Sequence, residues 1–271
     1  AGYNSMYDMN EFGFGTLKTG WQDVYYSMNN ITNGTYHAKI DYQSSAADWG
    51  NWWGASWIRA GLPGYVAGGN DELTKSLTGL PVFKTESKAE VTIPTFLKKK
   101  WTEEGRYDAE VAELKKYLSD NGYKMTVTNC ISYWLSTWVR EFGVDGFRCD
   151  TAKHVEKTSW KVLHDMCTEA LDTWKTKNPT KKLDDLDFWM TGEAWGHTVN
   201  YDDYYTTAKY DSMINFEVEQ NISKLSLGSV ANTYSSYAKA INTKSDFNVL
   251  TYLSSHDSSL TRQSDMKYYG S

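Results

Sequence analysis

The second half of the chain shows alternating helical and extended patterns of hydrophobic residues. Apolar side chains recur at helical spacing before Gly143, which is expected to end that helix. A longer helical pattern follows and is expected to stop at Asn178, because Pro179 cannot continue a helix. The first predicted helix face carries Ile131, Leu135, Trp138 and Val139, and the second carries Val162, Leu163, Met166, Ala170, Leu171 and Trp174.

Short apolar runs between and after these helices predict β-strands. One leads from Val144 to Asp150, the next from Asp187 to Glu193, a third covers 213–216, and a fourth leads from Phe247 to Asp257. Strands that alternate with helices are typical of a parallel sheet with helical cover. The sequence therefore predicts an α/β fold for this half.

Residues 1–125 have a different character. They are rich in Gly, Asn, Asp, Tyr and Trp and show no sustained periodicity, apart from a short helical pattern over 108–118. We expect a long irregular segment over 1–125 and a regular α/β part over 126–271. The tryptophans of the irregular segment are predicted to form mainly a small core of its own rather than an aromatic surface that binds a ligand. They are Trp49, Trp52, Trp53 and Trp57.

Asp150 ends the predicted strand in the run VDGFRCDTAKHV. Side chains alternate along a strand, so Arg148 and Asp150 are expected on one face and Cys149 on the other. A neighbouring guanidinium favours the carboxylate form that a nucleophile requires. A purely structural Arg–Asp pair that closes a strand is the competing interpretation.

Two further acids follow apolar runs in the same way. Glu193 stands between Trp189 and Trp195, whose apolar cover is expected to favour the protonated acid, and Asp257 follows His256. The intervals between the acids are long enough for strand–helix units of about thirty residues each, so the acids should meet on one rim of the sheet. The competing structural interpretation is that these side chains accept hydrogen bonds from backbone amides at a strand end, cap a helix or form a turn.

An ionised and a protonated carboxyl group form the pair that glycoside cleavage uses. One attacks the anomeric carbon and the other protonates the leaving oxygen. A non-catalytic carbohydrate-binding protein is the alternative from another class. A metal phosphohydrolase built on His256 and Asp257 would need more histidines than the 5 in the chain.

The runs DGFRCDTAKHV, TGEAW and LSSHD resemble, in this order, the second, third and fourth signature blocks of glycoside hydrolase family 13, the α-amylase family. The resemblance implies that Asp150 is the nucleophile, Glu193 the general acid/base and Asp257 the acid that stabilises the reacting glucose. Trp195, two residues beyond Glu193, is expected in the substrate cleft. By resemblance, the further substrate-binding residues are Arg148, Lys153, His154 and His256.

The sequence around TAKHV and MTGEAWGH is most similar to that of the periplasmic-type bacterial members of the family. This implies retaining hydrolysis of internal α-1,4-glucosidic bonds in starch and maltodextrins, a periplasmic or extracellular location, and a monomer in the full-length form. Related glucanotransferases and α-glucosidases use the same three acids and stay open as alternatives.

A complete (β/α)₈ barrel occupies about 250 residues. The chain has 271 residues and includes the long irregular segment, so the resemblance implies a partial barrel, its fourth to seventh strands, preceded by a domain B over 1–125. The opening Ala1-Gly2-Tyr3 resembles the end of the family's first block. We therefore expect an internal fragment that does not hydrolyse starch by itself.

The resemblance also implies a structural calcium ion. It implies the backbone carbonyl of His154 as one ligand and a domain B carboxylate as another, but the sequence has Val82 where that carboxylate is expected. A valine side chain cannot bind a hard cation, so Asp71 or Glu72 would have to replace it.

Charge and composition limit the class of partner. A net charge of −6 disfavours nucleic acids and anionic lipid surfaces, whereas a neutral polysaccharide is compatible with it. No apolar run approaches the roughly 18 residues of a membrane span. Three cysteines do not make a disulfide framework in a chain of this size, and Cys149 is predicted to be a small buried hydrophobic residue.

Overall fold

The computed structural model describes Gly54, residues 56–60, 71–73, 82–217 and 227–252, Ser255 and Asp257. The chain divides into two compact units, Ala1–Tyr133 and Trp134–Ser271. The division lies inside the helix α7 (Val127–Phe142), near the predicted boundary after residue 125. The assignment of residues 1–125 to a domain B stays a prediction.

The first unit contains a small antiparallel sheet and two helices before α7. β1 (Ile58–Ala60) pairs with β2 (Val82–Phe83), and α5 (Thr95–Glu103) and α6 (Tyr107–Asp120) follow. The pattern over 108–118 predicted α6, whereas α5 was not predicted, because its three consecutive lysines interrupt any apolar stripe.

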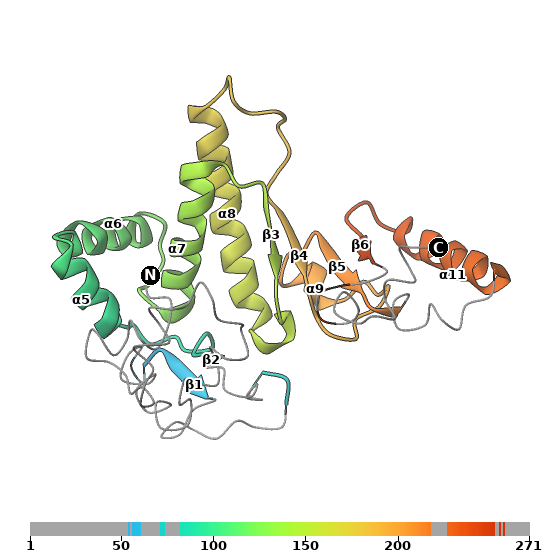
Figure 1. Cartoon of the computed structure of the whole chain (residues 1–271), viewed down its shortest axis with the longest axis horizontal. Helices are drawn as coiled ribbons and strands as arrows, with labels where there is room; N and C mark the ends of the chain where they lie inside the picture. The colour runs from blue at the N-terminus through green and yellow to red at the C-terminus, as the bar shows by residue number, and fades with distance from the viewer. Residues whose placement is uncertain are drawn as a thin grey trace, which may run out of the picture. The chain divides into compact units, whose positions relative to one another are not determined.

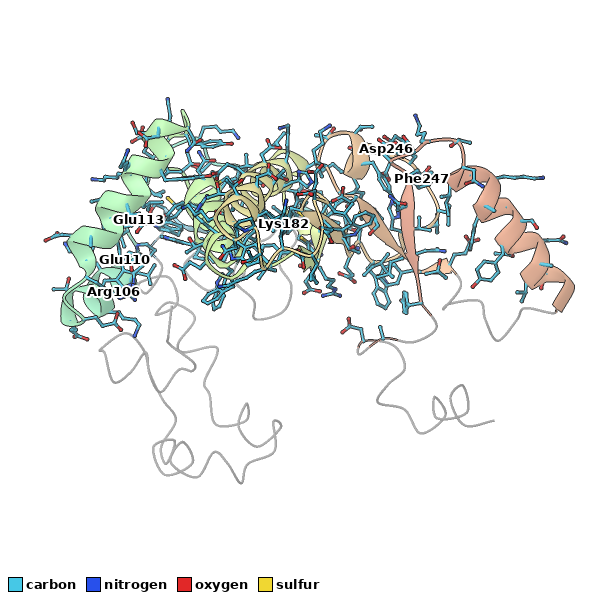
Figure 2. All side chains as sticks on the ribbon, turned by 90° about the horizontal axis from the view of Figure 1, so that it is seen from above. Arg106, Glu110, Glu113, Lys182, Asp246 and Phe247 are labelled. Carbon is cyan, nitrogen blue, oxygen red and sulfur yellow. The ribbon has the colours of Figure 1, made fainter. Side chains whose placement is uncertain are left out.

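Trp57 belongs to the core of this unit. Its side chain is buried and its indole N–H donates to the carbonyl oxygen of Thr92 at 2.9 Å, which confirms the predicted core role. The other three tryptophans of the group lie outside the described residues. Figure 2 shows Arg106, Glu110 and Glu113 along α6, where Arg106 and Glu110 form an ion pair.

The helix α7 ends as predicted, but its buried face is not the predicted one. Gly143 follows it with φ +66°, a conformation that suits glycine, and a Cβ there would lie 2.5 Å from the Trp174 ring. Leu135 and Trp138 are exposed, so their predicted place on the buried face was wrong. The buried residues of α7 are mostly small or polar and gave no strong apolar signal. They are Val127, Thr128, Cys130, Ser132, Tyr133, Ser136 and Val139.

The second unit is built from strand–helix repeats. Its elements are β3 (Gly146–Cys149), the 3-10 turn η2 (Ala152–His154), α8 (Lys157–Lys177), β4 (Trp189–Gly192), α9 (Asp203–Thr206), β5 (Ser212–Asn215), α11 (Leu227–Ile241) and β6 (Asn248–Thr251). The strands follow one another as β3-β4-β5-β6 and every pair is parallel (Figure 1). This confirms the predicted α/β class, with four described strands in the consecutive parallel order of a (β/α)₈ barrel.

The fourth predicted strand ends earlier than expected. β6 stops at Thr251, opposite Asn215, and does not extend to Asp257. The physical reason is that β5 ends there too. The N–H of Phe216 donates to the carbonyl oxygen of His197 at 2.9 Å instead of continuing the ladder.

The outward face of the sheet packs against α8 in one hydrophobic core. From the strands this core takes Cys149, Met190 and Met213, and from α8 it takes Leu163, Cys167, Ala170 and Leu171. Burial raises the pKa of the Cys149 thiol to about 12. Cys149 is therefore a buried, unreactive side chain, as predicted.

A short crossover joins β4 to β5 and is held by aromatic contacts. Tyr201 and Tyr205 pack against Phe247 with ring centroids 5.4 and 5.2 Å apart, and the Tyr201 hydroxyl donates to Asp246 at 2.6 Å. Figure 2 labels Asp246 and Phe247 at the start of β6.

Asp202 caps the short helix α9 of this crossover. Its carboxylate accepts the N–H of Tyr204 at 2.9 Å and lies 3.1 Å from Nε2 of His197. Burial by itself would raise the pKa of Asp202, but the hydrogen bonds from His197 and Tyr204 outweigh it and hold the pKa below its ordinary value.

None of the helices in the described part of the chain has both the length and the apolar character needed to cross a bilayer.

Candidate active site

Asp150 follows β3 directly and is tied to Arg148. Nη1 of the guanidinium donates to Oδ1 of Asp150 at 2.6 Å, as the predicted position of both side chains on one strand face allows. The Asp150 side chain is 64% exposed. One carboxylate oxygen is thus held by Arg148 while the group stays accessible to a ligand.

Glu193 follows β4 directly and is buried, with 6% of its surface exposed. Oε2 of its carboxyl group accepts the backbone N–H of Thr151 at 2.8 Å. Its own backbone is bonded to the end of β3 as well, because its N–H donates to the Cys149 carbonyl at 2.8 Å and its carbonyl accepts from Ala152 at 2.7 Å. Three hydrogen bonds therefore join the segments that follow β3 and β4.

The apolar cover of Glu193 does not come from the tryptophans as expected. Trp189 lies at the opposite end of β4, is 45% exposed, and donates its indole N–H to Oγ1 of Thr191 at 3.0 Å. Trp195 is half exposed and packs on Phe216 at a ring distance of 5.0 Å. The expected cover was wrong for Trp189, because it begins β4 and Glu193 follows the other end of that strand.

A cavity of about 180 Å³ opens at this end of the sheet. Glu193 and Asp257 both line it, together with Arg148, the partner of Asp150. The remaining lining residues are Ile214, Phe216, Leu250, Tyr252 and Ser255. The structure thus brings the three sequence-predicted acids to one end of four parallel strands.

The other predicted substrate-binding residues lie less directly at this cavity. Lys153 and His154 are in η2, where His154 is buried, and neither is among the described residues that line the cavity. The same holds for Trp195, which reaches the cavity through its contact with Phe216. His256 lies outside the described residues.

Two aromatic residues of the cavity were missed in the sequence. Phe216 and Tyr252 pack edge to face with ring centroids 5.6 Å apart, so Trp195, Phe216 and Tyr252 form a continuous aromatic row. Their only sequence signal is alternation, because Tyr252 is two residues beyond Leu250 and shares its face. Neither residue belongs to a motif with a charged group.

The calcium ligands implied by resemblance belong to different units of the chain. Asp71 is exposed and its carboxylate accepts the backbone N–H of Leu73 at 3.0 Å, while His154 belongs to the second unit. Val82 lies in β2 and its side chain offers no oxygen. Among the described residues, no three His, Cys, Asp or Glu side chains group as they would around a metal ion.

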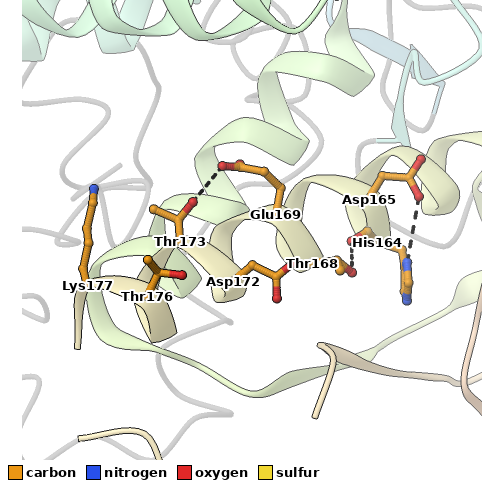
Figure 3. A pocket seen from close by; sticks show the side chains of 8 residues that line it. All are labelled: His164, Asp165, Thr168, Glu169, Asp172, Thr173, Thr176 and Lys177. Atoms are coloured by element: carbon orange, nitrogen blue, oxygen red, sulfur yellow. Dashed lines mark hydrogen bonds and ion pairs between the residues drawn. The ribbon is translucent and has the colours of Figure 1, made fainter. Parts of the chain in front are cut away.

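A larger hollow, of about 600 Å³, lies along α8 and is a different feature (Figure 3). Its lining residues all come from this one helix: His164, Asp165, Thr168, Glu169, Asp172, Thr173, Thr176 and Lys177. Several of them bond within the helix, as Thr173 does to Glu169 at 3.0 Å. A polar face of a single helix encloses no ligand, so we assign it no function.

Comparison with known sequences places this arrangement in a family. The family model described as "Alpha amylase, catalytic domain" matches residues 82–267. The chain is 39% identical over 274 residues to the periplasmic alpha-amylase of Escherichia coli (strain K12), which covers 97% of this chain and 38% of that protein. Over 80 residues it is 36% identical to an alpha-amylase of Streptomyces lividans, covering 29% of this chain and 8% of that protein.

Solved structures show weaker similarity. An Anoxybacillus α-amylase has a TM-score of 0.39 at 19% identity, over 53% of this chain and 29% of that chain. The α-amylase of Geobacillus thermoleovorans, complexed with acarbose, has a TM-score of 0.38 at 17% identity, over 67% of this chain and 31% of that chain. These scores are too low to bear on the fold. The sequence family match, however, covers more than half of the residues and includes Asp150, Glu193 and Asp257, and the chain therefore belongs to the α-amylase family.

Proposed function

We propose that the protein hydrolyses internal α-1,4-glucosidic bonds in starch and maltodextrins with retention of configuration. The supporting observation is that Glu193 and Asp257 line one cavity with Arg148, whose guanidinium holds Asp150. The chain spans 38% of the length of the E. coli relative. The activity of the whole protein is therefore proposed from the site and from family membership.

In the first half of the reaction, the two acids act on opposite sides of the scissile bond. Asp150 attacks the anomeric carbon through the carboxylate oxygen that Arg148 does not hold. Glu193 gives its proton to the glycosidic oxygen, which leaves with the remainder of the glucan. The products are a glycosyl ester on Asp150 and a Glu193 carboxylate.

In the second half, water replaces the departed sugar. The Glu193 carboxylate takes a proton from this water as the oxygen attacks the anomeric carbon. The bond to Asp150 breaks and its carboxylate is restored. Two displacements at one carbon return the original α configuration.

The remaining residues are proposed to bind and orient the substrate. Asp257 accepts hydrogen bonds from hydroxyl groups of the reacting glucose and offsets the positive charge that develops on its ring. Apolar sugar faces pack against Phe216 and Tyr252, while Trp195 extends this row. Lys153 and His154 are proposed to contact the leaving glucan, and His256 is proposed to bind the reacting glucose together with Asp257.

Similarity to a periplasmic relative supports export to the periplasm or the cell exterior as part of the proposal. A neutral α-glucan is the proposed partner, and the full-length protein is proposed to be monomeric.

Product configuration tests the proposal. The protein as its gene encodes it would be incubated with maltoheptaose, and the first products followed by proton NMR before mutarotation. We expect α-anomers of mixed chain length. Initial β-anomers would contradict the roles of both acids, because they indicate a single displacement.

The chain lengths in the same experiment separate the alternatives. Release of glucose alone indicates an α-glucosidase, and products longer than the substrate indicate a glucanotransferase. Binding of maltoheptaose without any cleavage indicates a non-catalytic α-glucan-binding protein.

A further inference from the structure

Thr151, the residue after Asp150, has an unusual backbone conformation. Its φ of 47° and ψ of 42° lie in the left-handed region, which a β-branched residue rarely adopts. Among the described non-glycine residues, only Thr151 and Lys209 have a positive φ. Strain of this kind persists where the surrounding structure requires the conformation, and it is concentrated at functional sites.

The left-handed turn directs two consecutive amides to the neighbouring strand end. The Thr151 N–H donates to Oε2 of Glu193 at 2.8 Å, and the Ala152 N–H donates to the Glu193 carbonyl oxygen at 2.7 Å. A chain that continued β3 in the extended conformation would alternate the directions of successive N–H groups. The turn at Thr151 therefore allows one short segment to hold both the side chain and the main chain of Glu193.

The side chain of Thr151 takes no part in this contact. In the part of the chain that the structure describes, the N–H and the carbonyl of Thr151 are hydrogen-bonded, but its hydroxyl is not. The backbone of this residue is thus the feature that matters. A glycine would supply the same N–H without the strain.

We propose that Thr151 is a positioning residue for the general acid. Its N–H holds Oε2 of Glu193. The proposal therefore places the transferable proton on the other oxygen, Oε1. The inference rests on the proposed function, because it assigns an orientation to the proposed acid. It couples the acid to the nucleophile, since the residue that orients Glu193 is bonded directly to Asp150.

Substrates that differ in their need for an acid test this proposal. A maltooligosaccharide needs a proton on its leaving oxygen, whereas the fluoride of α-maltosyl fluoride leaves without one. Thr151→Pro removes the N–H and forbids a positive φ. We expect kcat/KM to fall at least about 100-fold on maltoheptaose but to stay within about fivefold on α-maltosyl fluoride. Equal losses on both substrates, or no loss on either, would overturn the proposal.

Glycine substitutions provide the matched controls. Thr151→Gly keeps the N–H and removes the strain, so both kcat/KM values should stay within about threefold and the Tm should rise. Lys209→Gly relieves a left-handed residue away from the acids and should raise the Tm with no change in the ratio of the two rates. A large loss on maltoheptaose in Thr151→Gly would show that the side chain, not the backbone, acts on Glu193.

A second measurement needs neither folding of the proline variant nor catalysis. Hydrogen exchange of the Thr151 amide would be compared between the wild-type protein and Glu193→Ala, with Cys167 as an internal reference. We expect exchange at Thr151 to become at least about tenfold faster in the variant, because its acceptor is lost. Unchanged exchange would overturn the proposed contact. A wild-type protein that cleaves neither substrate but shows this exchange effect would refute only the proposed function.

Discussion

The two faces of the β3–β6 sheet come from the same strands but differ in what their side chains do. On the outward face, Cys149, Met190 and Met213 are at most 6% exposed and pack in one core with α8. On the inward face, Arg148, Trp189 and Leu250 are 37%, 45% and 48% exposed. A one-residue shift of register would exchange the two sets.

Within a single strand, the outward side chains therefore contribute mainly to stability and the inward side chains mainly to the chemistry of the site. Outward residues contribute by volume and apolar area, so residues of similar size can replace them. Polar inward residues contribute by charge and hydrogen bonding, as in the 2.7 Å contact between the hydroxyls of Thr191 and Ser212. We therefore expect substitutions on one face to change activity and substitutions on the other to change the free energy of unfolding.

The largest effect is expected when the acids that follow β3 and β4 are replaced by amides. Asp150→Asn and Glu193→Gln should each lower kcat on maltoheptaose by roughly 10²- to 10⁴-fold, because they remove the nucleophile and the proton donor. The Tm should change little, since each amide keeps the shape of the acid that it replaces and its carbonyl oxygen still accepts hydrogen bonds. Steady-state kinetics and thermal unfolding of the same samples would check both. If a variant kept more than about a tenth of the wild-type kcat, the role proposed for that acid would be wrong. A tenfold loss corresponds to only about 1.4 kcal/mol of activation free energy.

The opposite test makes a cavity on the outward face. Met190 is fully buried in the core, and Met190→Ala should reduce the free energy of unfolding by about 2–5 kcal/mol. Below the lowered Tm, kcat should remain within about twofold of the wild-type value, a change of less than about half a kcal/mol. Urea unfolding and kinetics in the cold would measure the two effects. A large loss of kcat in a folded variant would show that the outward face also controls the acids.

A smaller effect is expected at the last residue of β4, on the outward face. Gly192 precedes Glu193, and a Cβ there would lie 2.6 Å from the sulfur of Met213 and 3.0 Å from the buried Tyr210 ring. Gly192→Ala should therefore cost about 1–3 kcal/mol of overpacking. Gly228→Ala is the control, because nothing lies within 4 Å of its Cβ position. Equal unfolding free energies for the two variants would contradict the close approach at Gly192.

The smallest expected effect concerns the crossover between β4 and β5. The pKa of Asp202 is below its ordinary value of 3.8, so its charged form stabilises the fold at pH values above that range. This contribution is lost as the pH falls through the folded-state pKa. Asp202→Asn should cost about 1 kcal/mol near neutral pH and nothing at the acid end. Urea midpoints measured from neutral to acid pH would show whether the difference disappears on acidification.

Periodic patterns and charged motifs account for what could be predicted. The helix over Val162–Trp174, the stop at Asn178 and the strands before Asp150 and Glu193 were predicted and are present. These features are local, because helix spacing, proline and strand alternation act between near neighbours. The acids themselves were found by their motifs.

What escaped prediction depends on contacts between distant segments. The buried face of α7 is set by small residues such as Ser136, whose burial no hydropathy pattern indicates. Phe216 and Tyr252 line the cavity because β5 and β6 are neighbours in the sheet. The local sequence of either strand does not indicate which strand lies beside it. The bond from Thr151 to Glu193 likewise spans 42 residues and needs a positive φ.

That bond has a consequence for how the protein matures. Asp150 and Glu193 are separated by the whole of α8, and their relative position is fixed by hydrogen bonds between the segments that follow β3 and β4. A newly made chain carries both acids, but they are not in position for catalysis until α8 has formed and β4 has paired with β3. Recovery of activity after dilution from denaturant should therefore follow strand pairing rather than the earlier hydrophobic collapse.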